Sequence, residues 1–324
     1  MGAHMIAVAT QAGYLHGLSE DGALKWSYSI EGGLLSGVQA WGDARLVGAS
    51  SSRKLYAWGF DGQLQWLYNS QVNPSWVAVA GDRGLGFFAS GPYVYAITAH
   101  GALSWRAELG ATVRGPMLTD REGAAWLITD DGKLHRLETP YFHKSWALRE
   151  EAVKSDAEAR LLAVGSVEQG ATGALIQKGE SLSWLEPKSG SGWTLNGVQA
   201  AALSEPRASE TQSNLPSSVV VVLLSNGDIE WLSLASGTPI ASVHASQLGL
   251  NAESQVNLAG HDTRAFIADG AGRVWVWNQR GKWARCQISY APALQPVFDS
   301  RRQILVAGAG DGTVMGLGFV GDWQ

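Results

Sequence analysis

The stretch KLYAWGFDGQLQW, from Lys54 to Trp66, decides the fold because close copies of it recur along the chain. YLHGLSEDGALKW, from Tyr14 to Trp26, precedes it, and YVYAITAHGALSW, from Tyr93 to Trp105, follows it. Each copy has an apolar strand pattern, a turn that contains glycine, and a closing tryptophan. A self-similar unit at a fixed period indicates a repeat architecture, so the repeat is the starting point for any functional interpretation.

A four-residue core, called the quartet below, occurs in eight copies. Its first and fourth positions are apolar in every copy, and consecutive quartets are 39 to 48 residues apart. The quartets begin at Leu15, Leu55, Val94, Leu134, Leu182, Ile229, Val274 and Val314.

Each quartet is expected to form the third strand of a small sheet. An apolar strand precedes it, and the joining turns carry DDG, SNG, DGAG or GDG, whose residues accept the positive φ of tight hairpins. The closing tryptophan segment supplies a fourth strand after the quartet, and segments such as SWVAVAG supply an inner strand between copies. Four short strands in about 40 residues match a propeller blade. The sequence therefore predicts an all-β protein: one β-propeller of four-stranded antiparallel blades over residues 6–324, with eight blades or, alternatively, seven. The first copy lacks an obvious inner strand and the last lacks a full outer strand.

A column of tryptophans is predicted to seal each blade against the next. A tryptophan buries about 150–250 Å², and Ile240 takes its place in the sixth copy. Small residues in the third quartet position, such as Gly17 and Ala57, are expected to let neighbouring sheets approach closely. The tryptophans of the column are Trp26, Trp66, Trp105, Trp146 and Trp193.

Composition limits the classes of partner. Of the 324 residues only 16% are charged and the net charge is −5, which disfavours a nucleic-acid partner. No apolar run reaches the roughly 18 residues of a membrane span, so no membrane insertion is expected. Cys286 is the only cysteine, which excludes an internal disulfide and a cysteine-built metal site.

The first five residues, MGAHM, resemble a cloning scar and are left out of the fold prediction. No export signal follows them, which favours a cytoplasmic location. A signal peptide removed ahead of Met5 would instead place the protein in the periplasm.

LYAWGFDGQLQW and VYAITAHGALSW resemble the quinoprotein-type repeat, also called the PQQ-like repeat. The resemblance covers essentially the whole chain, is sharp in the first three copies, and implies a β-propeller, often of eight blades. Quinoprotein dehydrogenases of this kind bind pyrroloquinoline quinone and calcium and commonly carry adjacent cysteines, which this chain lacks. In size and in the degeneracy of its repeats the chain is more similar to the non-catalytic branch that includes the BamB lipoprotein.

No catalytic, cofactor-binding or metal-binding residues are predicted. The chain has no G-x-S-x-G elbow and no Walker motif. Asp130, Asp131 and Gly132 are interpreted as turn residues rather than a calcium loop. His16 and His135 share the second quartet position with Tyr, Trp, Ser, Glu and Met, which favours packing over catalysis.

Four residues are predicted to contact a partner at the mouth of the central channel, because they lie at or just before innermost strands. They are Trp76, Arg114, Glu253 and Gln255. Three insertions are the other candidates: Arg149–Arg160, Ser204–Pro216 and His244–Glu253, the last interpreted as an extended connection.

The sequence therefore favours a non-enzymatic, monomeric propeller scaffold that binds another protein or a peptide within a multiprotein assembly. The alternative is an enzyme or small-ligand-binding propeller with its site in the central channel.

Overall fold

The computed structural model describes residues 5–10, 12–35, 37–42, 45–80, 84–138, 145–147, 159–167, 172–187, 190–204, 218–250, 256–261, 264–269, 272–278, 282–287, 297–299, 304–308 and 314–318. The chain divides into two compact units, Met1–Leu161 and Leu162–Gln324, and each is described by itself.

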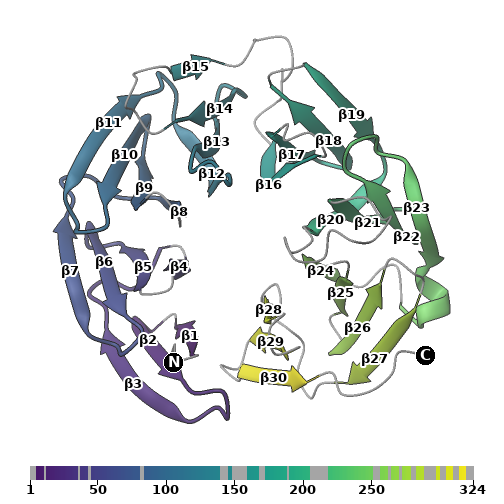
Figure 1. Cartoon of the computed structure of the whole chain (residues 1–324), viewed down its shortest axis with the longest axis horizontal. Coiled ribbons are helices and arrows are strands. Elements are labelled where there is room, and N and C mark those ends of the chain that lie inside the picture. The colour runs from purple at the N-terminus through teal and green to yellow at the C-terminus, as the bar shows by residue number, and fades with distance from the viewer. Residues whose placement is uncertain are drawn as a thin grey trace. The chain divides into compact units, whose positions relative to one another are not determined.

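Unit 1 contains four antiparallel sheets that follow one another in chain order (Figure 1). Sheet 1 is formed by β1 (Ile6–Ala9), β2 (Tyr14–Leu18) and β3 (Leu24–Ser29). Sheet 2 is formed by β4 (Gln39–Trp41), β5 (Arg45–Ser50), β6 (Lys54–Gly59) and β7 (Leu64–Asn69). Sheet 3 is formed by β8 (Trp76–Ala80), β9 (Leu85–Ser90), β10 (Tyr93–Thr98) and β11 (Leu103–Glu108). Sheet 4 is formed by β12 (Val113–Thr119), β13 (Ala125–Thr129), β14 (Leu134–Leu137) and β15 (Ser145–Ala147).

Unit 2 contains the other four sheets, and β16 begins at the boundary between the units. Sheet 5 is formed by β16 (Arg160–Ser166), β17 (Thr172–Lys178), β18 (Ser181–Glu186) and β19 (Ser191–Leu195). Sheet 6 is formed by β20 (Val198–Ser204), β21 (Val219–Leu224), β22 (Asp228–Ser233) and β23 (Pro239–His244). Sheet 7 is formed by β24 (Val256–His261), β25 (Arg264–Asp269), β26 (Arg273–Asn278) and β27 (Trp283–Gln287). Sheet 8 is formed by β28 (Val297–Asp299), β29 (Ile304–Gly308) and β30 (Val314–Gly318).

Every quartet lies on the predicted third strand of its sheet, so the repeat and the fold have the same period. Six sheets have four strands, and the two terminal sheets have three within the described residues. Sheet 1 begins with the strand that precedes the quartet, and sheet 8 ends with the quartet strand. Residues 1–4 and 319–324 lie outside the described part, so the expected lack of an inner strand in the first copy and of an outer strand in the last stays a prediction.

The burial of each strand follows its place in the sheet. In sheets 2 and 3 the second and third strands, β5, β6, β9 and β10, are buried along almost their full length. The outer strands β3, β7 and β11 instead alternate between exposed and partly buried residues. A strand whose two faces are both covered reads as a continuous apolar run, whereas a half-covered strand alternates. The middle strands are therefore covered on both faces.

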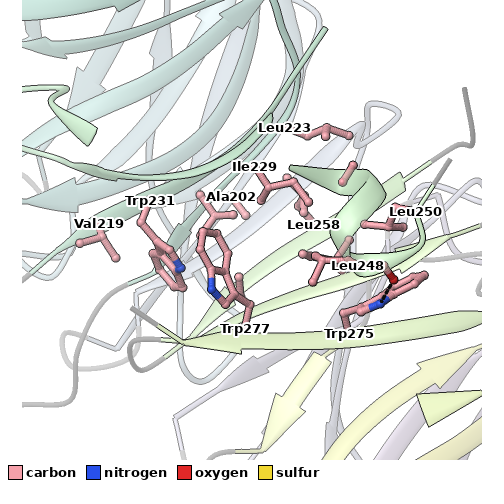
Figure 2. Packing of buried hydrophobic residues seen from close by; sticks show 14 residues of the cluster. Ala202, Val219, Leu223, Ile229, Trp231, Leu248, Leu250, Leu258, Trp275 and Trp277 are labelled. Atoms are coloured by element: carbon pink, nitrogen blue, oxygen red, sulfur yellow. Dashed lines mark hydrogen bonds between the residues drawn. The ribbon is translucent and has the colours of Figure 1, made fainter. Parts of the chain in front are cut away.

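Apolar side chains from consecutive sheets form the cores of the two units. In unit 1, Val47 and Ala57 of sheet 2 share a cluster with Phe88 and Ile97 of sheet 3. In unit 2, side chains of sheets 6 and 7 form the cluster that Figure 2 shows, in which Trp231 lies 5.8 Å from Trp277 between ring centres. A twisted sheet cannot bury both faces alone, so consecutive sheets complete each other's cores.

Side chains on the inner strands of unit 1 tie three sheets together. The Gln39 amide on β4 donates to the Val77 carbonyl on β8 at 2.7 Å. The Thr119 hydroxyl on β12 donates to the Val79 carbonyl, which also lies on β8, at 2.8 Å. β8 is therefore held from both sides by hydrogen bonds that do not belong to any sheet ladder.

Candidate functional site

One face of unit 1, called the hairpin face below, is built from the turns between the second and third strands and from the connections between sheets. In an antiparallel four-stranded meander, these turns and connections lie at the same end of the strands. Backbone bonds join them across sheets: Ser51 donates to the Gly33 carbonyl at 3.2 Å, and Ser70 donates to the Arg53 carbonyl at 2.8 Å. These two bonds tie the turn of sheet 2 to the connections on either side of it.

Trp76 and Arg114, two of the predicted contact residues, both lie on the hairpin face. Ser75, next to Trp76, donates its N–H to the Ala89 carbonyl at 2.7 Å, and Val113, next to Arg114, donates to the Gly91 carbonyl at 2.8 Å. Both acceptors belong to the end of the β9–β10 hairpin, so the two inner strands start at the same hairpin. Trp76 is partly buried and packs against the core of sheets 3 and 4, whereas Arg114 is exposed.

Glu253 and Gln255, the other two predicted contact residues, lie outside the described residues. Most of the insertions Arg149–Arg160 and Ser204–Pro216 also lie outside them. These predictions therefore stay predictions.

The connection His244–Glu253 is described as far as Leu250, and in that part it is not simply extended. It forms a 3₁₀ helix, η1 (Ala245–Leu248), whose first turn is capped by His244. Leu248 and Leu250 are buried in the core of sheets 6 and 7, and the Trp275 indole donates to the Leu248 carbonyl at 2.8 Å (Figure 2). The segment is an insertion between sheets 6 and 7 as predicted, and its leucines supply apolar surface to the core. Its role in partner binding stays a prediction.

Three of the five column tryptophans donate a hydrogen bond to the following sheet. Trp26 donates to the Phe60 carbonyl at 3.0 Å, Trp66 to the Ala99 carbonyl at 2.9 Å, and Trp193 to the Leu234 carbonyl at 2.7 Å. Each acceptor lies in the turn between the third and fourth strands of the next sheet.

A glycine in each of those turns lies against the face of the same indole. Gly62 has φ +82°, and a Cβ built on it would lie 2.5 Å from the ring of Trp26. Gly101 has φ +80°, and its Cβ would lie 2.8 Å from the ring of Trp66. Only glycine fits both the left-handed backbone and the indole above it.

The other two column tryptophans are less fully defined. The Trp105 indole packs against Phe87 with ring centres 5.8 Å apart, and its buried Nε1 has no hydrogen-bond partner in the described part of the chain. Trp146 lies on β15 opposite Arg136. That all five tryptophans seal one sheet to the next stays a prediction, which the substitution in the Discussion tests.

The small residues of the third quartet position make room for the tryptophan of their own sheet. Gly17 is paired with Trp26 across β2 and β3, and a Cβ on Gly17 would lie 2.2 Å from that indole. Ala57 is paired with Trp66 in the same way. The expectation that these residues act directly between sheets needs correction, because the indole lies over them and itself reaches the next sheet.

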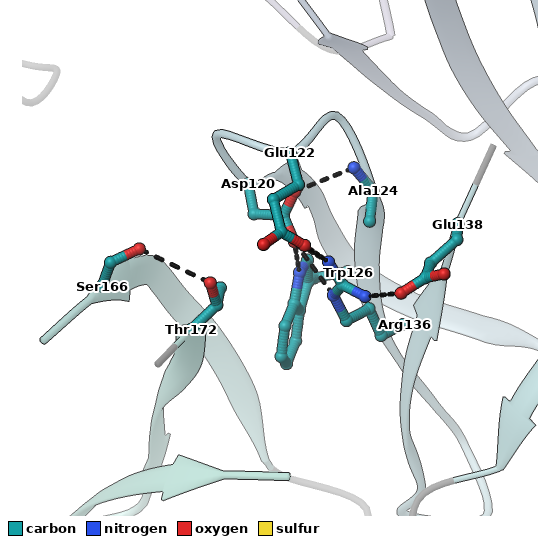
Figure 3. Close-up of polar contacts among 8 residues, drawn as sticks. All are labelled: Asp120, Glu122, Ala124, Trp126, Arg136, Glu138, Ser166 and Thr172. Atoms are coloured by element: carbon teal, nitrogen blue, oxygen red, sulfur yellow. Dashed lines mark hydrogen bonds and ion pairs between the residues drawn. The ribbon is translucent and has the colours of Figure 1, made fainter. Parts of the chain in front are cut away.

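A buried ion pair in sheet 4 is the strongest polar cluster in the described part of the chain (Figure 3). The Asp120 carboxylate accepts from Arg136 Nε at 3.0 Å, from the Trp126 indole at 2.8 Å and from the Ala124 N–H at 2.8 Å. The Asp120 side chain is 1% exposed and the Arg136 side chain 9% exposed. Glu122 and Glu138 also pair with the guanidinium. Burial lowers the pKa of Arg136, but Asp120 and the two glutamates outweigh it and raise that pKa above its usual range.

Sheet 7 contains a smaller version of this arrangement. Arg273 Nε donates to Asp269 at 2.7 Å, and the guanidinium lies over the Trp275 ring at 5.4 Å. Arg273 Nη1 also donates to the Gly249 carbonyl at 2.7 Å. The pair therefore fixes the segment after η1 to the hairpin between β25 and β26.

The β13–β14 turn uses its polar residues locally. Asp130 accepts from the Thr112 N–H at 3.1 Å, whereas Asp131 accepts from the Thr129 hydroxyl at 2.5 Å. His135 Nε2 lies 2.9 Å from that hydroxyl. Because the hydroxyl has one hydrogen and gives it to Asp131, His135 donates to the threonine.

Burial lowers the pKa of His135 below its usual value of 6.5, and the nearby Lys133 acts in the same direction while Asp131 opposes them. The neutral imidazole is thus favoured in the folded state, so its contribution to the free energy of unfolding is present above pH 6.5 and declines as the pH falls below 6.5.

We expect His135→Gln to reduce the loss of unfolding free energy between about pH 7.5 and pH 5.5. Urea unfolding across this range measures it, with His100→Gln in an exposed turn as control. An unchanged pH profile in His135→Gln would contradict the assignment.

His16 lies on β2 in sheet 1, far along the chain from His135 in sheet 4. Its ring stacks on Tyr14 with centres 5.9 Å apart, and its buried Nδ1 has no hydrogen-bond partner among the residues that the structure describes. Within the described residues, no group of three or more His, Cys, Asp and Glu side chains is arranged to hold a metal ion.

Sequence reasoning missed two features of these sites. Arg136 occupies the third quartet position, where small residues were expected, and this mismatch was a readable signal of a polar cluster. Arg53 occupies a turn position that is glycine in most other copies, and its role is argued below.

Comparison with solved structures identifies the architecture. BamB from Moraxella catarrhalis aligns with a TM-score of 0.68 and 16% identity over 98% of this chain and 92% of that one. The chain has a β-propeller fold. The prediction of an all-β propeller and the resemblance to PQQ-like propellers such as BamB are confirmed at the level of the fold.

Two further structures with this propeller fold differ widely in kind. The dihydro-heme d1 dehydrogenase NirN in complex with DHE aligns with a TM-score of 0.68 and 12% identity over 97% of this chain and 70% of that one. The computationally designed Ika8 protein aligns with a TM-score of 0.70 and 13% identity over 97% and 93%. The propeller matches no known protein-family model and no curated protein sequence. An enzyme and a designed protein share this fold, so the fold alone does not assign an activity.

Among the described residues, none of the helical structure is long and apolar enough to cross a membrane.

Proposed function

We propose that this β-propeller is a non-enzymatic scaffold that binds another protein, as part of a multiprotein assembly, through the hairpin face of unit 1. The observation that carries the proposal is the common anchoring of Trp76 and Arg114 on the end of the β9–β10 hairpin. Glu253 and Gln255 remain predicted contact residues of unit 2.

The chemistry of the hairpin face suits a protein partner. Tryptophan and arginine are enriched among the residues that dominate binding energy in protein interfaces. Trp76 on sheet 3 is fixed by the core beneath it, and Arg114 on sheet 4 is exposed. A rigid aromatic residue loses little conformational entropy on binding, which supports a contact role for a partly buried tryptophan.

Site-specific photo-crosslinking in the native cell tests the proposal. A photoreactive amino acid at the exposed Thr112, next to Val113 on the hairpin face, should capture a protein partner. The same amino acid at the exposed Ser104, on the outer strand β11, is the matched control and should not capture it. Arg114→Ala should lower the captured amount about ten-fold, the effect of losing one interface hot spot.

The outcome separates the hairpin face from other surfaces. Capture at Ser104 but not at Thr112 would move the interface to the outer strands and overturn the proposal. Capture at Thr112 that Arg114→Ala leaves unchanged would keep the face and remove Arg114 from it.

A further inference from the structure

Arg53 stands at a turn position where the equivalent turns of four other sheets have glycine. The second and third strands of these sheets are joined by turns of three or four residues, and each turn contains the residue two positions before the quartet. That residue has a positive φ in each case: Gly13 +83°, Gly132 +79°, Gly227 +88° and Gly272 +78°. In sheet 2 it is Arg53, with φ +64°, the one non-glycine residue with positive φ in the described part of the chain.

The backbone around Arg53 matches that of its glycine counterparts. The Arg53 carbonyl accepts from Ser70 N–H at 2.8 Å, as the Gly13 carbonyl accepts from Ile30 at 2.7 Å and the Gly227 carbonyl from Ala245 at 2.8 Å. These turns require the left-handed backbone conformation at the residue two positions before the quartet. A side chain with a Cβ is disfavoured there, and glycine is not.

The fold alone therefore gives no reason for an arginine at this position. Residues that keep a disfavoured backbone conformation cluster at ligand-binding sites, and the inference runs from the observed outlier to a role. The feature to be explained is the side chain, because the backbone would be served better by glycine.

The Arg53 guanidinium is exposed but held in place. Its Nε donates to the Asn73 Oδ1 at 3.1 Å, and Asn73 lies in the connection that leads to Trp76. No other polar partner of the guanidinium occurs among the described residues. Its two Nη groups form a fork that matches the two oxygens of a carboxylate.

The other polar groups of the same turn are already engaged. Lys54 pairs with Glu31, the Ser52 hydroxyl donates to the Glu31 carbonyl at 2.8 Å, and the Ser51 hydroxyl donates to the Gly32 carbonyl at 2.5 Å. Arg53 is thus the free cationic group of this turn. One available positive charge suits one carboxylate better than a phosphate dianion, which usually collects several cations.

We propose that Arg53, positioned by Asn73, binds an aspartate or glutamate carboxylate of an acidic segment of the protein partner. This inference rests on the proposed function, because Arg53 lies on the hairpin face beside the connection to Trp76. It adds the chemistry of the partner and a residue that sequence reasoning did not select.

The first test uses the purified full chain and Arg53→Gly, which restores the residue of the sibling turns. The melting temperature of Arg53→Gly should stay within about 2 °C of the wild type or rise, because strain is relieved. Gly227→Arg, the reverse change in sheet 6, should lower the melting temperature. A clear destabilisation by Arg53→Gly would show that Arg53 serves the fold and would overturn the proposal.

The second test measures binding with a displayed library of random 12-residue peptides selected on the wild-type chain. The selected peptides should be enriched in Asp and Glu and should bind Arg53→Gly about ten-fold or more weakly. Arg53→Lys should be intermediate, because lysine keeps the charge and loses the fork. Lys25→Ala, which removes one exposed charge on the outer strand β3, should bind as the wild type does.

Each contrary result has a definite meaning. Peptides without acids, peptides that bind Arg53→Gly as tightly as the wild type, or no binding peptides at all would overturn the proposal. A requirement for phosphoserine in place of Asp or Glu would overturn the choice of a carboxylate.

The crosslinking experiment keeps this proposal separate from the function. If a partner is captured at Thr112 equally in the wild type and in Arg53→Gly, the role of Arg53 fails and the proposed function stands. If acidic peptides bind through Arg53 but nothing is captured at Thr112, the proposed function fails and the Arg53 site stands.

Discussion

Replacing Arg136 with alanine is expected to lower the free energy of unfolding by about 3–5 kcal/mol. The change leaves the Asp120 carboxylate, whose side chain is 1% exposed, with only the Trp126 indole and the Ala124 N–H as partners. An unpaired buried charge is the costly product of breaking such a pair, more than the loss of the attraction itself. Urea unfolding followed by tryptophan fluorescence measures the effect.

A double variant separates the cost of the unpaired buried charge from the loss of the attraction between the two charges. Asp120→Leu with Arg136→Met removes both charges and should recover much of the stability lost in Arg136→Ala, because no buried charge remains. Lys54→Ala breaks the exposed pair with Glu31 and should have a much smaller effect. A loss below about 1 kcal/mol in Arg136→Ala would show that water reaches Asp120 and that the cluster is not a buried one.

The repeat allowed the sheets to be predicted because each quartet satisfies the same local demands. Its apolar first residue is buried in seven of the eight copies, its fourth in five of the seven copies whose burial is described, and the preceding turn needs a residue with positive φ. These demands are local, and they repeat every sheet, so they leave a pattern in the sequence.

The polar clusters were harder to predict because they join residues from different strands. Asp120 lies in a turn and Arg136 on β14, and only the sheet brings them within 3.0 Å. The inward packing of Leu248 and Leu250 was not predicted, because polar and small residues surround them in the sequence and a 3₁₀ turn precedes Leu250. Trp76 and Arg114 were selected by their place before inner strands, but nothing local indicated that one hairpin end anchors both.

Arg53 shows a signal that was present in the sequence and was not used. Aligning the residue two positions before each quartet places an arginine in a column that is mostly glycine. Such a break in a repeat column has little meaning until the backbone angle is known, since many turns accept any residue. The φ of +64° at Arg53 shows that this turn favours glycine, so the arginine there indicates a role of its side chain.

Replacing Trp66 with alanine is expected to lower the free energy of unfolding by about 3 kcal/mol, the lower end of the range for large aromatic residues because Trp66 is only partly buried. The substitution removes the indole that packs edge-on against Trp41, with ring centres 6.2 Å apart, and lies over Gly101. It also removes the hydrogen bond to the Ala99 carbonyl in the next sheet. Urea unfolding measures the loss, and an effect below about 1 kcal/mol would contradict a sealing role.

Phenylalanine at the same position separates the hydrogen bond from the packing, and the repeat supplies the matched control. Trp66→Phe should cost about 1 kcal/mol more than Trp105→Phe, because the buried Trp105 Nε1 has no hydrogen-bond partner among the described residues. If both substitutions cost the same, the bond to Ala99 contributes nothing measurable and the indoles act by packing alone. A larger cost at Trp66 would show that the polar edge of the indole, as well as its area, joins one sheet to the next, which explains why the column keeps tryptophan rather than phenylalanine in five copies.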